Sequence, residues 1–170
     1  LLRLGADVSL VWVNTGNSLL HKLAIDGAVA PMSWVMEQGI ALDYRNSQGD
    51  TALILSVRHG HLKVAEFLLS KGANPHLKNN REESAVFAAL LAGDVAMLSI
   101  LLGREYVLPR LHLAVELGER GALGALMQHG GVDELDERGH SAFFMAMGRG
   151  DVESGIILLD GGANPGISCG

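Results

Sequence analysis

The chain has 170 residues, of which 48% are hydrophobic and 19% are charged, a balance that excludes an intrinsically disordered chain. Its net charge of −6 argues against nucleic acid as a partner, because the phosphate backbone attracts basic surfaces. The one cysteine, Cys169, excludes an intrachain disulfide bond and favours a reducing, cytoplasmic setting inside the cell.

A serine or threonine recurs along the chain at a fixed spacing. Ser18, Thr51 and Ser84 are 33 residues apart from one to the next, and we call this position the marker. Pro109 and Ser141 continue the series, but Pro109 follows Ser84 after only 25 residues, eight fewer than 33. A fixed period of this length indicates an array of similar structural units.

Glycines recur in the same register. A glycine lets the chain turn with a positive φ where a helix ends. Glycine follows each marker by nine residues at Gly27, Gly60, Gly93, Gly118 and Gly150, and by 21 residues at Gly39, Gly72, Gly130 and Gly162, with Glu105 in its place in the third copy.

Apolar residues between these glycines predict pairs of short helices. One helix pair cannot bury its own apolar face, so paired leucines such as those at 68–69, 101–102 and 158–159 are expected to face neighbouring helices. The first helices of the pairs are predicted over 19–26 and 52–59, and the second helices over 62–70, 95–102 and 152–159.

One apolar stretch, residues 85–102, approaches the length of a membrane-spanning helix. Gly93 and Asp94 interrupt it at the position where the repeat register places a corner between two helices. A charge at the centre of a bilayer is costly. We therefore expect two buried helices and no membrane insertion.

Residues 49–74 carry the most complete copy, Gly-Asp-Thr-Ala-Leu-Ile-Leu-Ser-Val-Arg-His-Gly-His-Leu-Lys-Val-Ala-Glu-Phe-Leu-Leu-Ser-Lys-Gly-Ala-Asn. This sequence resembles the ankyrin repeat, and the resemblance covers nearly the whole chain. It implies an all-α fold, an ankyrin-repeat solenoid of stacked helix-turn-helix pairs with finger loops. It also implies one domain over 1–170, a piece of a longer protein, with a remnant at 1–14 and repeats at 15–47, 48–80, 81–105, 106–137 and 138–170, the fourth with a shortened finger.

The short spacing before Pro109 predicts a gap or kink in the row of fingers between Leu102 and Pro109. Gly121 and Gly124 are expected to weaken the helix that follows by roughly 1 kcal/mol each relative to alanine. This segment is therefore expected to be the least stable part of the chain.

Seven histidines raise the question of a metal or catalytic site. His21 and His112 match the histidine of the Thr-Pro-Leu-His turn of ankyrin repeats, and His61 follows Gly60 as it commonly does in the family, so the resemblance implies structural roles. A zinc site needs further ligands at suitable spacing, which His59 and His61 lack. We expect His59 on the surface, no metal, no cofactor and no catalytic residue, and hence no enzyme activity.

Three further expectations concern side chains outside these motifs. Trp34 is expected in the core of its repeat. The acidic residues at 133, 134, 136 and 137 are expected on an exposed finger without a pocket that could shift a pKa. His76, His129 and His140 are expected in solvated loops.

In the ankyrin family, partners usually meet the concave side, which is made of finger tips and the ends of first helices. Four of the matching residues are basic, and because guanidinium groups pair with carboxylates, the expected partner is a protein or peptide with acidic residues. Ordinary solvation is the alternative interpretation for each charge, and packing on the first repeat is the alternative for Trp12. The implied contacts are Trp12, Arg45, Gln48, Asp50, Arg58, His59, Lys78, Arg81 and Glu83.

The expected function is that of a non-catalytic protein-interaction module within a larger intracellular scaffold or adaptor. One alternative is a regulatory or targeting segment of an enzyme whose catalytic domain lies outside this chain. A structural spacer without a partner is a third hypothesis. The sequence leaves the identity of the partner and the oligomeric state open.

Overall fold

The computed structural model describes residues 14–103 and 109–167. Trp12, Cys169 and most of the predicted gap before Pro109 lie outside these residues. The described part contains helices and no strand, apart from an isolated bridge between Leu135 and Ser141, and the predicted all-α fold is confirmed. The helices are α1 (Leu19–Asp26), α2 (Met32–Glu37), α3 (Ala52–Arg58), α4 (Leu62–Ser70), α5 (Ala85–Ala92), α6 (Val95–Leu102), α7 (Arg110–Leu117), α8 (Arg120–Met127), α9 (Ala142–Gly148) and α10 (Val152–Asp160).

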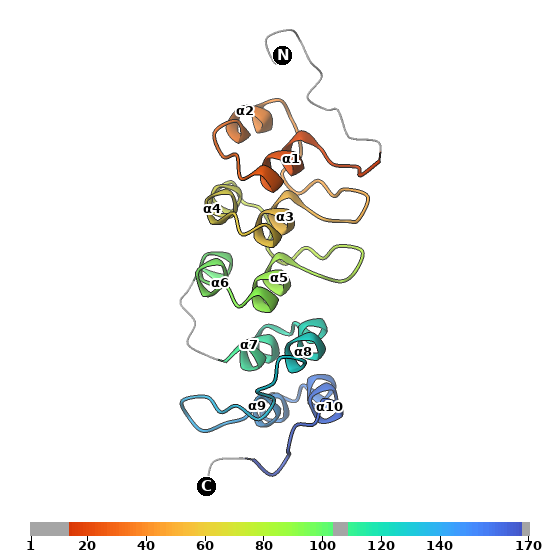
Figure 1. Ribbon diagram of the computed structural model, residues 1–170, viewed down its shortest axis with the longest axis vertical. Helices are drawn as coiled ribbons and strands as arrows, with labels where there is room; N and C mark the ends of the chain where they lie inside the picture. The colour runs from red at the N-terminus through yellow and green to blue at the C-terminus, as the bar shows by residue number, and fades with distance from the viewer. Residues whose placement is uncertain (1–13, 104–108, 168–170) are drawn as a thin grey trace. The chain divides into compact units, whose positions relative to one another are not determined.

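The helices fall into two compact units (Figure 1). The first unit holds α1 to α4, α6 and residues 85–89 of α5, and the second holds residues 90–92 of α5 and α7 to α10. In the first unit α1 contacts α2 and α3, and α4 contacts α3 and α6. In the second unit α7 contacts α8 and α9, and α10 contacts α8 and α9. The single domain that the sequence predicts over 1–170 stays a prediction.

Helix boundaries follow the repeat register. α1, α4 and α6 begin and end where the sequence predicts, α3 ends one residue early at Arg58, and α10 extends one residue further to Asp160. The five glycines nine residues after the markers all adopt a left-handed conformation, with φ between 66° and 73°. Residues other than glycine rarely adopt such backbone angles, so the predicted corner between the two helices of each pair is confirmed.

Two predictions about the core are wrong. Leu158 is buried, but its neighbour Leu159 is 42% exposed, so only one leucine of that pair faces the neighbouring helices. Trp34 is 37% exposed, because the inward side of α2 is taken by Met32 and Val35, which are fully buried. Successive residues of a helix point in different directions, and a run of apolar residues therefore cannot all reach the core. Within the described ranges, every helix falls short of the length and apolar character that crossing a lipid bilayer requires.

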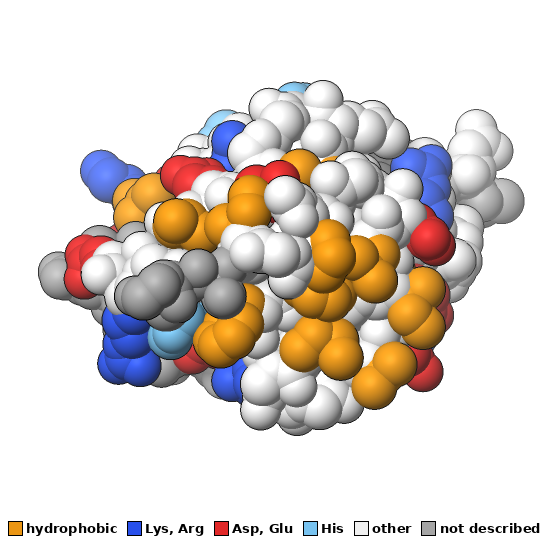
Figure 2. All heavy atoms as spheres, turned by 90° about the horizontal axis from the view of Figure 1, so that it is seen from below, with side chains coloured by type: hydrophobic (Ala, Val, Ile, Leu, Met, Phe, Trp, Pro, Cys, Tyr) orange, Lys and Arg blue, Asp and Glu red, His pale blue; other side chains and the backbone are white. Residues whose placement is uncertain are grey.

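Hydrophobic side chains gather on the end of the second unit that α9 and α10 form (Figure 2). Phe144 and Met147 of α9 are 43% and 46% exposed, whereas the residues at the same repeat positions in α7, His112 and Val115, are buried beneath α9. This end therefore has the composition of a face that packs against another helix pair.

Buried or half-buried histidines join neighbouring repeats in both units. Nε2 of His21 lies 3.0 Å from the carbonyl oxygen of Asp50, which can only accept, so Nε2 carries the proton. Its Nδ1 then accepts from the Ser18 hydroxyl at 2.8 Å and the Ser18 N–H at 3.2 Å. His61 similarly donates through Nε2 to the carbonyl oxygen of Ile25 at 2.9 Å. The structural roles implied for these histidines are confirmed.

His112 repeats this contact only in part. Its Nε2 donates to the carbonyl oxygen of His140 at 2.8 Å. Its Nδ1 is buried and has no hydrogen-bond partner among the described residues, because the marker here is Pro109, which offers neither a hydroxyl nor an N–H. A buried polar atom without a partner costs about 1–3 kcal/mol.

Replacing Pro109 with serine, the residue at three other markers, supplies both missing donors to His112. We expect the free energy of unfolding to rise by about 1 kcal/mol, because the new cap and the paired acceptor outweigh the lost rigidity of proline. Urea unfolding followed by circular dichroism measures this change. Pro109→Ala is the control, since it restores the N–H alone. Equal stability of the serine and alanine variants would contradict this explanation.

The buried His21 makes stability depend on pH. Burial lowers the pKa of His21, whereas the unfolded residue keeps its ordinary value of about 6.5. Below that pH the unfolded state binds more protons than the folded state, so the free energy of unfolding falls as the pH falls. We expect His21→Ile to reduce this fall. Isoleucine is the residue that the next repeat carries at the equivalent position, as Ile54. Urea unfolding at about pH 7.5 and about pH 5.5 tests the prediction, with exposed His76→Ala as the control that keeps the full fall.

Candidate partner-binding surface

The fingers are short hairpins that precede the first helix of a repeat. We name them by that helix: the α1 finger (residues 14–17), the α3 finger (45–50), the α5 finger (78–83) and the α9 finger (135–140). Backbone hydrogen bonds of 2.9–3.0 Å close three of them, from Asn46 N–H to the Asp50 carbonyl, from Asn79 N–H to the Glu83 carbonyl and from Asp136 N–H to the His140 carbonyl.

One side chain fixes the turn of each of these three fingers. Oδ1 of Asn46 accepts from the N–H groups of residues 48 and 50, both at 2.9 Å. Asn79 and Asp136 accept from the corresponding N–H groups of their own fingers at 2.8–3.0 Å. Such side-chain acceptors replace the backbone partners that a tight turn lacks. The tips of the fingers are therefore held by their own sequence.

Two acidic residues, one in the α9 finger and one just before it, correct a prediction. Asp136 was expected to be solvated, but its side chain is only 5% exposed, and the N–H of His140, with that of Arg138, holds its pKa below the ordinary value. Asp133 accepts from the N–H of Asn164 at 2.8 Å. These two carboxylates are structural, and His140, expected in solvent, stacks on a phenylalanine ring at 4.8 Å.

Backbone hydrogen bonds also tie the fingers of the first unit side by side. The Ser47 N–H donates to the Thr15 carbonyl at 3.0 Å, and the Asn80 N–H donates to the Gln48 carbonyl at 3.0 Å. Arg45 adds a side-chain bond from Nη2 to the carbonyl of Lys78 at 2.8 Å. The α1, α3 and α5 fingers thus form a row whose spacing is set by the backbone.

A polar network around buried Asp50 and Asn79 holds the base of this row. Arg58, at the end of α3, donates through Nη1 to Asp50 at 2.8 Å and pairs through Nη2 with Glu83. Asn79 donates to both carboxylates, at 2.7 Å and 3.1 Å. The side chain of Asp50 is only 1% exposed, so the prediction that Asp50 contacts a partner is wrong. Arg58 and Glu83 are engaged by the fold in the same network.

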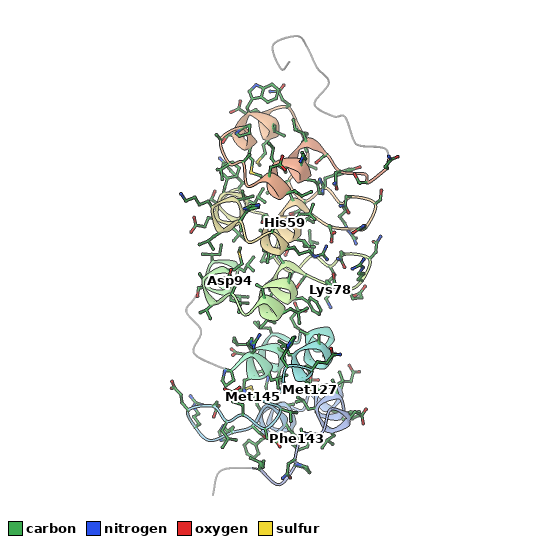
Figure 3. All side chains as sticks on the ribbon, viewed as in Figure 1. His59, Lys78, Asp94, Met127, Phe143 and Met145 are labelled. Carbon is green, nitrogen blue, oxygen red and sulfur yellow. The ribbon has the colours of Figure 1, made fainter. Side chains whose placement is uncertain are left out.

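Four of the remaining predicted contacts lie on the tips of adjacent fingers. Arg45, Gln48, Lys78 and Arg81 are exposed on the α3 and α5 fingers, and Figure 3 labels Lys78 there. His59 follows α3 and is exposed, with its ring stacked on that of His61. The structure therefore brings the four finger residues together.

Glu82, on the same finger, was not among the predicted contacts. It is the one residue besides glycine with a positive φ in the described part of the chain, at 61°. The signal was present in the repeat register, because the same position is glycine at residues 16, 49 and 139.

The described residues contain no group of three or more His, Cys, Asp and Glu side chains placed to hold a metal ion. A hollow of about 50 Å³ in the second unit lies among Arg110, Leu111, Leu126, Gly130, Gly131 and Glu134. Pockets for small ligands are several times larger, so the fingers are the stronger candidate for recognition.

The network at the base of the fingers makes a stability prediction. Arg58→Met removes the charge that faces buried Asp50 and is expected to lower the free energy of unfolding by about 1–3 kcal/mol. Urea unfolding provides the measurement. Arg81→Met, at an exposed tip, is the matched control and is expected to change stability by less than about 0.5 kcal/mol. Equal losses in both variants would show that the network does not stabilise the fold.

Comparison with known proteins identifies relatives of this chain. The chain is 31% identical over 156 residues to a probable E3 ubiquitin-protein ligase of Oryza sativa, covering 87% of this chain and 31% of that protein. It is 29% identical over 163 residues to neurogenic locus notch homolog protein 1 of Homo sapiens, covering 89% of this chain and 6% of that protein. The chain thus spans less than a third of the length of these relatives.

An ankyrin repeat domain from Acinetobacter baumannii has a similar solved structure, with a TM-score of 0.51, 24% identity and coverage of 88% of this chain and 83% of that one. A family model of three ankyrin repeats matches residues 1–79, and a model of many ankyrin repeats matches residues 57–102. With its helix pairs, glycine corners and fingers, the chain belongs to the ankyrin-repeat family, whose repeats generally mediate protein–protein interaction.

Proposed function

We propose that the chain is a non-catalytic module of an intracellular protein that binds a partner protein or peptide through the α3 and α5 fingers. The observation that carries this proposal is the row of fingers itself. Exposed side chains stand there on a backbone that hydrogen bonds fix before any partner arrives. A surface that is ordered in advance loses less conformational entropy on binding.

The charges that remain available define the chemistry of the partner. Arg81 makes no side-chain hydrogen bond to any described residue, and Lys78 is paired only with Glu82, at 3.9 Å. Both side chains are exposed and can meet carboxylates of a partner. Arg58 and Glu83, in contrast, satisfy each other. The partner is therefore a segment with acidic residues that lies along the α3 and α5 finger tips, on the side that ankyrin proteins commonly use.

A second candidate function follows from one relative. The probable E3 ubiquitin-protein ligase matches 87% of this chain, and the match spans 31% of that protein. In this alternative, the chain is the targeting segment of an enzyme, and its finger partner is a substrate. A catalytic domain in the full-length protein would favour this alternative, and the same finger residues would then select the substrate.

Affinity capture from a cell extract with mass spectrometry tests the proposal. The bait is the whole chain, compared with a Lys78→Glu/Arg81→Glu variant. We expect a genuine partner to be captured at least about tenfold less by the variant, because two attractive contacts become repulsive. Arg45 and Arg58 are left unchanged, since both hold the fingers in place.

The matched control is Arg138→Glu, an exposed arginine on the α9 finger of the second unit. It should capture the partner as well as the original chain does. Thermal unfolding of all three proteins first confirms that each is folded. Equal capture by the original chain and the Lys78→Glu/Arg81→Glu variant would reject the proposed surface.

A further inference from the structure

The α5 finger departs from the other fingers at one backbone position. Two residues before the marker, the α1, α3 and α9 fingers carry a glycine. These are Gly16, Gly49 and Gly139, with φ between 66° and 77°. The α5 finger carries Glu82 there, with φ 61°. Residues with a Cβ rarely adopt this left-handed conformation, so glutamate is an unfavourable choice for the finger itself.

Glycine at this position also makes room for the next finger. A Cβ on Gly16 would lie 2.7 Å from the backbone nitrogen of Ser47, and a Cβ on Gly49 would lie 2.7 Å from that of Asn80. These two nitrogens are the ones that tie the fingers into a row. Glu82 carries a Cβ, so the close approach that Gly16 and Gly49 allow is not available at this position.

The side chain of Glu82 makes little stabilising contact with the described part of the chain. It is 82% exposed, and its ion pair with Lys78 spans 3.9 Å. Ion pairs this exposed contribute little to stability. Its neighbour Glu83 differs, because it pairs with Arg58 and is only 23% exposed. The unfavourable backbone of Glu82 is therefore not offset by contacts within the fold.

We infer that Glu82 is a specificity-determining contact that receives a lysine or arginine side chain of the partner bound to the fingers. This inference rests on the proposed function. Arg81 and Lys78 attract acidic residues of the partner, and Glu82 beside them attracts a basic one. A surface with both signs fixes the direction in which a charged segment lies, because the reversed segment would place like charges together.

Two substitutions separate the charge from the backbone. Glu82→Gly introduces the residue of the other fingers, so we expect the melting temperature to rise by roughly 2–4 °C while binding weakens. Glu82→Gln keeps the strained backbone and removes only the charge. It should leave the melting temperature unchanged and weaken binding to the same extent, about three- to fivefold.

The probe is a peptide selected from a displayed random library against the whole chain and then synthesised. Its dissociation constant is measured by fluorescence anisotropy with the original chain, both Glu82 variants and the Lys78→Glu/Arg81→Glu variant. We expect all three variants to bind more weakly. Replacing the responsible lysine or arginine of the peptide with glutamate should reverse the difference, so that Glu82→Gln binds the altered peptide more tightly than the original chain does, because glutamate repels Glu82. Glu82→Lys should restore binding of that altered peptide.

The outcomes distinguish the two proposals. If Lys78→Glu/Arg81→Glu weakens binding but both Glu82 variants bind as the original chain does, the role of Glu82 is overturned and the finger surface stands. If no variant changes binding, the finger surface is rejected and the role of Glu82 with it. A Glu82→Gly variant that melts no higher than the original chain would overturn the argument from backbone strain.

Discussion

In three of the fingers, one side-chain oxygen supports the turn, and two of these fingers form the surface on which the proposed function depends. Oδ1 of Asn46, Asn79 or Asp136 accepts two backbone N–H groups and so holds the turn. The turn then does not depend on the tip side chains for its shape, and those side chains can differ from finger to finger. Fingers with the same backbone can therefore present different side chains to a partner.

Charge by itself does not mark a binding residue in this chain. Arg58 stands at the end of a first helix, where ankyrin repeats commonly present contacts, yet its charge is matched by Asp50 and Glu83. Arg45 likewise gives its donors to carbonyl groups of two fingers. Lys78 and Arg81 lie beyond these networks, which is why we propose them as the contacts to a partner. What separates the two groups of basic residues is therefore their position between the fingers and not their charge.

The repeat register predicted most of the fold. The markers and the glycines that follow them placed the ends of α1, α4 and α6 correctly, although Glu105 replaces the second glycine in the third copy. The burial of Asp50 could not be predicted, because its partners Arg58 and Asn79 meet it only when two fingers lie side by side. Adjacent residues also looked equivalent in the sequence: Leu159 and Leu158 differ only in the direction in which the helix turns them. Glu82 could have been found from the register alone, because glycine stands at its position in the other fingers.

The backbone bonds between fingers have a consequence for hydrogen exchange. Ser47 and Asn80 lie on exposed loops, where amide protons usually exchange quickly with solvent. Their N–H groups are nevertheless bonded to the neighbouring finger. Each of these amides can exchange only when two fingers separate, so its protection reports the spacing of the row directly. The exchange rates of these two loop amides therefore measure how firmly the fingers of the first unit are held together.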